Sequence, residues 1–247
     1  MRSSILTLIL IAIVTSASAQ WGDNYIKLSE TITTKTKDIT DFEKIDVSED
    51  FEVHIRFSDT TEKVEIEANE NLHDLIEVRK EGNTLRISTK SYSTSHGIGR
   101  KSGAKERLVA YITTKKLTEI KGDEDVVIVL KDKLYSDELT IDLNEDSSLE
   151  GFIEVQKLIV DLEEDSTLDI EGSTVSMQVT ADEDSIIEGY GFIVEDLAIE
   201  LNEDSEAKLT VNGDIDLVAK DDSYFYYRGA GNFTRKKLRG DSEVKHR

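Results

Sequence analysis

The chain has 247 residues and a formal net charge of −22, and it contains neither cysteine nor proline. A protein this acidic is repelled by nucleic acid and by anionic membrane surfaces, so neither is expected as a partner. Without cysteine there are no disulfides, and stability must come from packing, hydrogen bonding or bound ions.

Residues 1–19 have the pattern of a secretory signal peptide. A basic start at Met1-Arg2 precedes an apolar run from Ile5 to Val14 and a small-residue cleavage site at Ala17-Ser18-Ala19. The run is too short to cross a bilayer, which takes about 20 residues, and no later segment is apolar enough to form a transmembrane segment. We therefore predict export to the periplasm, the outer-membrane surface or the medium, with residues 20–40 as an N-terminal extension.

Residues 41–120 are predicted to form a β-rich half of the protein. Apolar and polar residues alternate in several short runs, which is typical of half-buried strands. A tight turn at Gly82-Asn83 is expected to join two of them. The runs are Phe51–Phe57, Val64–Ala68, Leu85–Ser88 and Leu108–Ile112.

A short acidic unit recurs through residues 121–247. Its central Asp returns every 18 to 21 residues, and alternating apolar residues precede it in a fixed register, as Leu158, Val160 and Leu162 precede Asp165. The units are Glu124-Asp125-Val126, Glu145-Asp146-Ser147, Glu164-Asp165-Ser166, Glu183-Asp184-Ser185, Glu203-Asp204-Ser205, Asp221-Asp222-Ser223 and Gly240-Asp241-Ser242.

A coil this short cannot bury its own apolar side chains, whereas stacked coils form a continuous core. The sequence therefore predicts an all-β protein, a parallel β-helix or β-solenoid with coils of about 19 residues. Each coil is expected to contain a strand, a Glu-Asp-Ser turn, a second strand and a Gly-containing turn. Residues 41–120 are expected to cap and continue the stack.

The acidity belongs to the repeats. Residues 121–222 hold 31 acidic and 6 basic residues, whereas the end of the chain from Tyr224 onward is a basic cap. Stacking would place equivalent carboxylates about 4.8 Å apart, where they repel. Either Ca²⁺, a hard cation with oxygen ligands, compensates them, or they form a solvated acidic face. The candidate ligands are Glu145, Asp146, Glu164, Asp165, Glu183, Asp184, Glu203 and Asp204. No other cofactor is expected.

An aromatic run near the C-terminus is a candidate ligand surface. Tyr224, Tyr226, Tyr227 and Arg228 could stack on sugar rings, or the run could be a strand that closes the core. Polysaccharide and surface protein are the partners considered. The sequence does not indicate an oligomeric state.

The order of these segments is similar to that of a known family. Phe42, Ile45 and Val47 open a series that continues through Val53-x-Ile55, Val64-x-Ile66, Leu85-x-Ile87 and Ile112-Thr113 before the short turns begin. The series resembles the putative auto-transporter adhesin head-GIN domain of the Bacteroidetes cell envelope. In that family the turns usually read Ser-Gly-Ala-Ser, where this chain has Asn144-Glu145-Asp146-Ser147.

The resemblance implies a non-catalytic, secreted or cell-envelope adhesin or binding module. A carbohydrate-active β-helix enzyme is the first alternative, because such folds cleave polysaccharides with paired carboxylates. A catalytic pair must differ from its neighbours in burial or in charge, and here every coil repeats the same pair, so no catalytic residue is predicted. A purely structural envelope protein is the second alternative.

Overall fold

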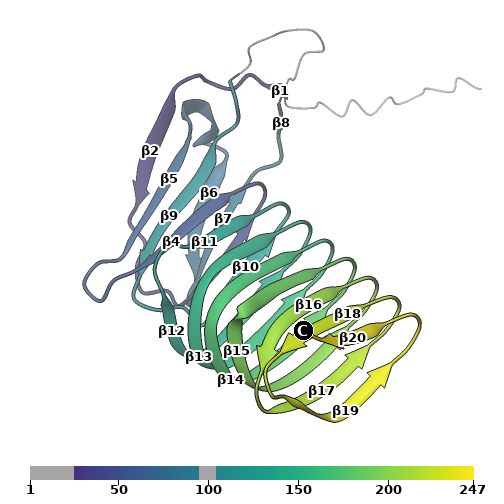
Figure 1. Cartoon of the computed structure of the whole chain (residues 1–247). Helices are drawn as coiled ribbons and strands as arrows, with labels where there is room; N and C mark the ends of the chain where they lie inside the picture. The colour runs from purple at the N-terminus through teal and green to yellow at the C-terminus, as the bar shows by residue number, and fades with distance from the viewer. Residues whose placement is uncertain (1–24, 95–103) are drawn as a thin grey trace, which may run out of the picture.

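The computed structural model describes residues 25–94 and 104–247, and the predicted signal peptide, residues 1–19, lies outside these ranges. Within them the chain is all-β, with one short 3₁₀ turn, η1 (Glu70–Leu72). The strands stack in parallel as a solenoid that runs from the N-terminal half to the C-terminus (Figure 1). The predicted fold class is confirmed. No helix in the described part of the chain is long and apolar enough to span a membrane.

Each coil of the solenoid has three faces. In the coil of residues 148–166, face B is residues 148–150, which follow a Glu-Asp turn, face C is residues 153–155, and face A is residues 158–162, which lead into the next turn. Three long strands pass through all three faces: β13 (Ser148–Leu162), β14 (Thr167–Ala181) and β15 (Ile186–Leu201). The strand β12 (Leu134–Leu143) covers faces C and A only.

Shorter strands complete faces A and B at both ends of the stack. On face A these are β3 (Lys44–Ser48), β10 (Glu119–Asp123), β17 (Asp214–Ala219) and β19 (Asn232–Leu238). On face B they are β4 (Glu52–Phe57), β11 (Val127–Leu130), β16 (Glu206–Val211), β18 (Tyr224–Arg228) and β20 (Glu243–His246).

The core consists of columns of equivalent apolar residues. On face A, Leu139 pairs with Leu158, Leu158 with Met177, Met177 with Leu197, and Leu197 with Ile215. All five are buried, so the alternation in the sequence is the inward and outward alternation of each strand. Burial of such side chains stabilises the fold by about 1.5–3 kcal/mol each, which makes the columns the main source of stability.

The glycine near the middle of a coil bends the strand without ending it. The sequence predicts a Gly-containing turn between two strands, whereas β13 and β14 continue through Gly151 and Gly172 with their parallel pairing intact. At Gly172 φ is +118°, and a Cβ there would lie 2.0 Å from the carbonyl oxygen of Ile153. The backbones of adjacent coils approach so closely here that only glycine, which has no Cβ, fits at the bend.

The N-terminal half caps the stack and continues it, as predicted. Strand β3 lies between β7 (Thr84–Thr89) and β10, and β4 lies between β9 (Leu108–Thr114) and β11, all in parallel. Antiparallel strands then close this end: β2 (Ile32–Lys37), β5 (Lys63–Asn69) and β6 (Ile76–Glu81). The expected turn at Gly82-Asn83 joins β6 and β7. A separate two-stranded pair consists of β1 (Tyr25–Ile26) and β8 (Ser93–Thr94).

Candidate functional site

The Glu-Asp turns adopt one backbone geometry in coil after coil. Both residues of each pair have positive φ, with 49° at Glu164 and 60° at Asp165. The backbone N–H of Asp146 donates to the carbonyl oxygen of Glu164 at 2.9 Å, and Asp165 does the same to Glu183 at 2.8 Å. Left-handed backbone is unfavourable for residues other than Gly, Asn and Asp, so hydrogen bonds between coils must hold the Glu of each turn in place.

The turns place their acidic side chains outward and their serines inward. Both carboxylates of each pair are exposed to solvent: Glu145, Asp146, Glu164, Asp165, Glu183, Asp184, Glu203 and Asp204. The following serines are fully buried in the first four coils of the series, at Ser147, Ser166, Ser185 and Ser205. Within the described residues no three acidic, histidine or cysteine side chains converge as they would around a metal ion. Calcium binding by the pairs and a solvated acidic face both remain alternatives, to be decided by experiment.

The serine column is a structural element that the sequence pattern did not reveal. Ser166 Oγ donates to the carbonyl oxygen of Glu163 at 2.6 Å, and Ser185 Oγ donates to that of Asp182 at 2.6 Å. Ser147 Oγ also accepts from the backbone N–H of Val126, one coil away, at 3.2 Å. A hydroxyl at this position satisfies buried backbone groups, which apolar residues could not do.

The Glu-Asp pairs of successive coils stack on one another, and we call this stack the acidic ladder. It begins with a pair that lies before the first repeat in the sequence. Glu49 and Asp50 also have positive φ, and their backbone N–H groups donate to the carbonyl oxygens of Asp123 and Glu124 at 3.1 and 2.9 Å. Burial and the neighbouring carboxylates, Asp125 first, raise the pKa of Asp50. The pKa of Glu124 is raised in the same way, by burial and then by Glu49. Burial and neighbouring charges thus act in the same direction on both acids where the ladder starts.

A small acidic hollow lies beside this first rung. It has a volume of about 540 Å³ and is lined by Glu49, Asp50, Glu106, Glu124 and Tyr92, among others. The Tyr92 hydroxyl donates to Glu106, and burial with that hydrogen bond strongly raises the tyrosine pKa. The phenol stays protonated at neutral pH, so its chemical role here is that of a hydrogen-bond donor.

The aromatic residues near the C-terminus divide between two faces of β18. Tyr224 and Tyr226 face outward and stack with ring centroids 6.3 Å apart. Tyr227 points the other way, where it stacks on Phe225 at 5.6 Å and packs against the end of the core. Of the four residues proposed as one ligand surface, Tyr224, Tyr226 and Arg228 thus share the outward face, whereas Tyr227 packs against the core.

Cations lie beside Tyr226, whereas Tyr224 is paired with Glu206 and Glu243 on the neighbouring strands. The Arg247 guanidinium lies 4.8 Å from the centroid of the Tyr226 ring, and the Lys245 ammonium lies 5.9 Å from it. Arg228 lies at 4.1 Å over the ring of Tyr190, which belongs to β15, two strands away from β18. We call Tyr224, Tyr226, Arg228, Lys245 and Arg247 the tyrosine–cation surface. It stands at the basic end of an otherwise acidic solenoid.

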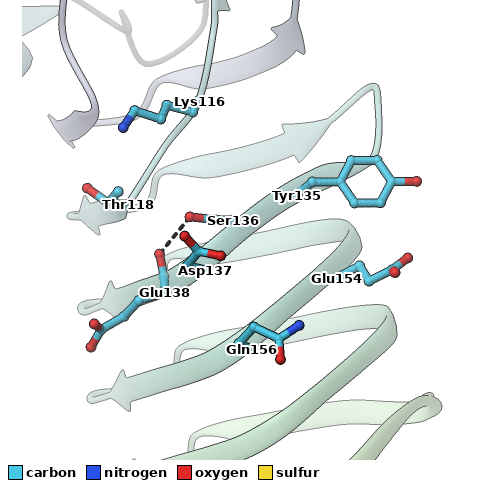
Figure 2. A pocket seen from close by; sticks show the side chains of 8 residues that line it. All are labelled: Lys116, Thr118, Tyr135, Ser136, Asp137, Glu138, Glu154 and Gln156. Carbon is cyan, nitrogen blue, oxygen red and sulfur yellow. Dashed lines mark hydrogen bonds between the residues drawn. The ribbon is translucent and has the colours of Figure 1, made fainter.

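A groove opens on face C at the coil where that face begins (Figure 2). Its volume is about 550 Å³, and it is lined by Lys116, Thr118, Tyr135, Ser136, Asp137, Glu138, Glu154 and Gln156. Tyr135 is 59% exposed, the most exposed large hydrophobic residue in the described part of the chain. The sequence gives no sign that Tyr135 belongs to a groove, because the other lining residues come from three segments that meet only when the coils stack.

These features define a parallel β-solenoid with exposed acidic turns and with aromatic and charged side chains on its outer faces. The chain belongs to the family described as putative auto-transporter adhesin, head GIN domain, whose model matches residues 41–231. The resemblance seen in the sequence is therefore confirmed. Among curated proteins, none matches the sequence.

Solved structures with the same fold carry related descriptions. A putative adhesin from Bacteroides fragilis is 19% identical with a TM-score of 0.76, covering 90% of this chain and 100% of that one. A putative adhesin from Parabacteroides merdae is 18% identical with a TM-score of 0.67, covering 91% and 99%. A protein from Parabacteroides distasonis described as putative lipid binding is 15% identical with a TM-score of 0.70, covering 91% and 100%. At these identities the likeness concerns the fold.

Proposed function

We propose that this chain is an exported, non-catalytic adhesive module of the cell envelope, and that its C-terminal coils bind acidic polysaccharide. The observation that carries the proposal is the tyrosine–cation surface, where Tyr226 stacks with Tyr224 and lies beside Lys245 and Arg247. An aromatic ring offers a flat apolar face to a sugar ring, and its negative π-face attracts the C–H groups of the sugar. The cations would attract carboxylate or sulfate groups on the same chain.

The charge distribution supports this choice of partner. Residues 121–222 would repel an acidic polymer along most of the solenoid. Near the C-terminus, Arg228, Lys237, Arg239 and Arg247 form no ion pair with another described residue, so their charge is available to a ligand. The family and the solved adhesins support a binding role for the fold as a whole.

The arrangement of the carboxylates supports a non-catalytic role. Glycoside hydrolysis needs one acid and one base in different environments, so that one is protonated while the other is charged. The pairs on successive coils share one exposed geometry, from Glu145-Asp146 to Glu203-Asp204. No pair stands apart from its neighbours, and the proposal therefore assigns them no reaction.

Binding to immobilised polysaccharide tests the proposal. The wild-type chain should bind oligogalacturonate or alginate at low ionic strength, and binding should fall as salt is added, because salt screens the cations. Tyr226→Ala with Arg247→Ala should reduce binding at least tenfold. Val175→Ala, an exposed change on another face, should leave it unchanged.

Two results would overturn the proposal. One is equal binding by the double variant and the wild type. The other is release of new reducing ends from any polysaccharide in a way that depends on one Glu-Asp pair. If the chain instead binds an immobilised protein and no polysaccharide, the proposed partner is wrong and the adhesive role belongs to a protein partner.

A further inference from the structure

We propose that the groove around Tyr135 is a second binding site, specific for an uncharged oligosaccharide. This inference rests on the proposed glycan-binding role and adds to it a separate site with the opposite charge preference. The groove lies on face C near the N-terminal half, whereas the tyrosine–cation surface lies on face B near the C-terminus.

The groove exists because face C starts abruptly. Residues Leu134–Ser136 of β12 are the first strand segment on this face, and they pair with β13 on one side only. On the other side the chain segment before β10 supplies Lys116 and Thr118 instead of a strand (Figure 2). The result is a hollow about 550 Å³ in volume, which is within the range of small-molecule sites.

Tyr135 supplies an aromatic platform in this hollow. Its side chain projects outward from β12 and is 59% exposed, with no aromatic or cationic side chain stacked on it among the described residues. The exposed ring therefore offers an apolar face that a ligand can cover. A pyranose ring fits because its apolar C–H face can pack on the ring while its hydroxyls reach the polar rim.

The polar rim has the groups that hydroxyls need. Glu154 lies beside Tyr135 on the next coil, and Asp137 and Gln156 line the groove further from the ring (Figure 2). Carboxylates accept hydrogen bonds, and an amide both donates and accepts, so together they can match vicinal hydroxyls. Ser136 and Thr118 already donate to backbone carbonyl oxygens, of Glu138 at 2.9 Å and Glu43 at 3.2 Å, so their remaining role is to accept.

The charge of the groove excludes acidic sugars. Lys116 is paired with Glu43 at 2.8 Å, and Glu138 is paired with Lys157 at 2.7 Å, so these charges are compensated. Asp137 and Glu154 form no ion pair with another described residue and leave the groove negative. Uronic acid or sulfate groups would be repelled there, whereas neutral hexoses would not.

A peptide strand fits the groove less well than a sugar. The free edge of β12 on face C spans only Leu134–Ser136, whereas strands are typically five to six residues long. An added peptide would therefore gain few backbone hydrogen bonds before the bend. A glycan depends on the exposed ring and its rim, both of which are present.

Binding of neutral oligosaccharides by the full chain tests the site. The probes are hexamers of β-linked glucose, mannose and xylose, with oligogalacturonate as the acidic comparison, and titrations follow chemical shifts or tyrosine fluorescence. At least one neutral hexamer should bind in a way that Tyr135→Ala weakens tenfold or more. Tyr135→Phe should retain the binding, because the platform remains. Ile193→Ala, in the same outward column of face C, should leave it unchanged.

The outcomes separate this inference from the proposed function. If no neutral hexamer binds, or if Tyr135→Ala binds as tightly as the wild type, the groove is not a glycan site. Binding of acidic polysaccharide through Tyr226 and Arg247 would stand in that case. Conversely, loss of neutral binding in Tyr135→Ala alone, with acidic binding intact, would establish two sites. Stronger binding of oligogalacturonate than of neutral sugars at the groove would also overturn the inference.

Discussion

The Ser166 hydroxyl donates a hydrogen bond of 2.6 Å to the backbone carbonyl oxygen of Glu163, closing an acidic turn from the inside of the solenoid. Ser166 is fully buried, whereas Glu164 and Asp165 between these two residues are exposed. The turn thus joins a solvated surface to a dry core within four residues. The stability of the turn therefore depends on its buried serine more than on its exposed acidic residues.

Replacement of Ser166 by alanine should destabilise the fold. The substitution leaves the Glu163 carbonyl without this donor in a buried setting, which costs about 1–3 kcal/mol. Urea denaturation should show this loss in the free energy of unfolding. Ser176→Ala, on an exposed part of β14, should change it by no more than about 0.5 kcal/mol. Equal effects for the two variants would show that the buried hydrogen bond contributes nothing.

Substitution of Gly172 should be far more damaging than substitution of Gly82. At Gly172 a Cβ would lie 2.0 Å from the Ile153 carbonyl oxygen, in a backbone that cannot move without breaking the pairing of β13 and β14. Gly172→Ala should therefore lose more than about 4 kcal/mol or fail to fold. Gly82 has φ +61° with nothing within 4 Å, so Gly82→Ala should cost about 1–2 kcal/mol. Thermal unfolding of the two variants, measured together, checks the ranking.

Sequence periodicity was sufficient to predict the solenoid, because each apolar column depends only on alternation and on a constant coil length. The same reasoning missed the first rung at Glu49-Asp50. That rung lies beside Glu124-Asp125 only because β3 and β4 stack next to β10 and β11, after the intervening hairpins have returned the chain. A search for a constant spacing misses this pair, because the strands between Asp50 and Glu124 interrupt the regular coil length.

The candidate site was less predictable than the fold for a related reason. Alternation along β18 would have separated Tyr227 from Tyr226, since neighbouring residues of a strand face opposite ways. The structure shows that separation, with Tyr227 packed beside Phe225. Tyr135 could not have been recognised, because the groove depends on where face C begins and on Lys116 and Thr118 across the gap.

The raised carboxyl pKa values should add stability as the pH falls from neutral towards the ordinary range of carboxyl groups, whereas the lowered pKa of the buried His73 acts in the opposite direction. The pKa of Asp50 is raised in the folded state, by burial and then by Asp125, so the folded chain binds its proton more tightly than the unfolded chain does. Stability from such a group is present at low pH and is lost as pH rises through the folded-state pKa. Burial raises the pKa of Glu124, Asp161 and Glu163 in the same direction.

Asp50→Asn isolates this effect. Asparagine tolerates the positive φ of 50° at this position and removes the charge, so the melting temperature at pH 7 should rise. The rise should shrink as the pH falls towards 5, because the wild-type carboxyl is increasingly protonated there. Asp59→Asn, which removes an exposed charge outside the ladder, is the matched control. A drop in melting temperature for Asp50→Asn at pH 7 would contradict the argument.

Calcium should stabilise the ladder no more than its ionic strength explains. The carboxylates of Asp146, Asp165 and Asp184 are exposed, and at the spacing of stacked coils two such charges repel by about 1 kcal/mol in water. Mobile ions screen charges of this kind, with a Debye length of about 10 Å at 0.1 M salt. Melting temperatures in millimolar CaCl₂ should therefore match those in NaCl of equal ionic strength. Asp146→Asn with Asp165→Asn and Asp184→Asn should reduce the response to both salts. A rise specific to Ca²⁺ that this triple variant abolishes would instead establish ordered calcium sites on the turns.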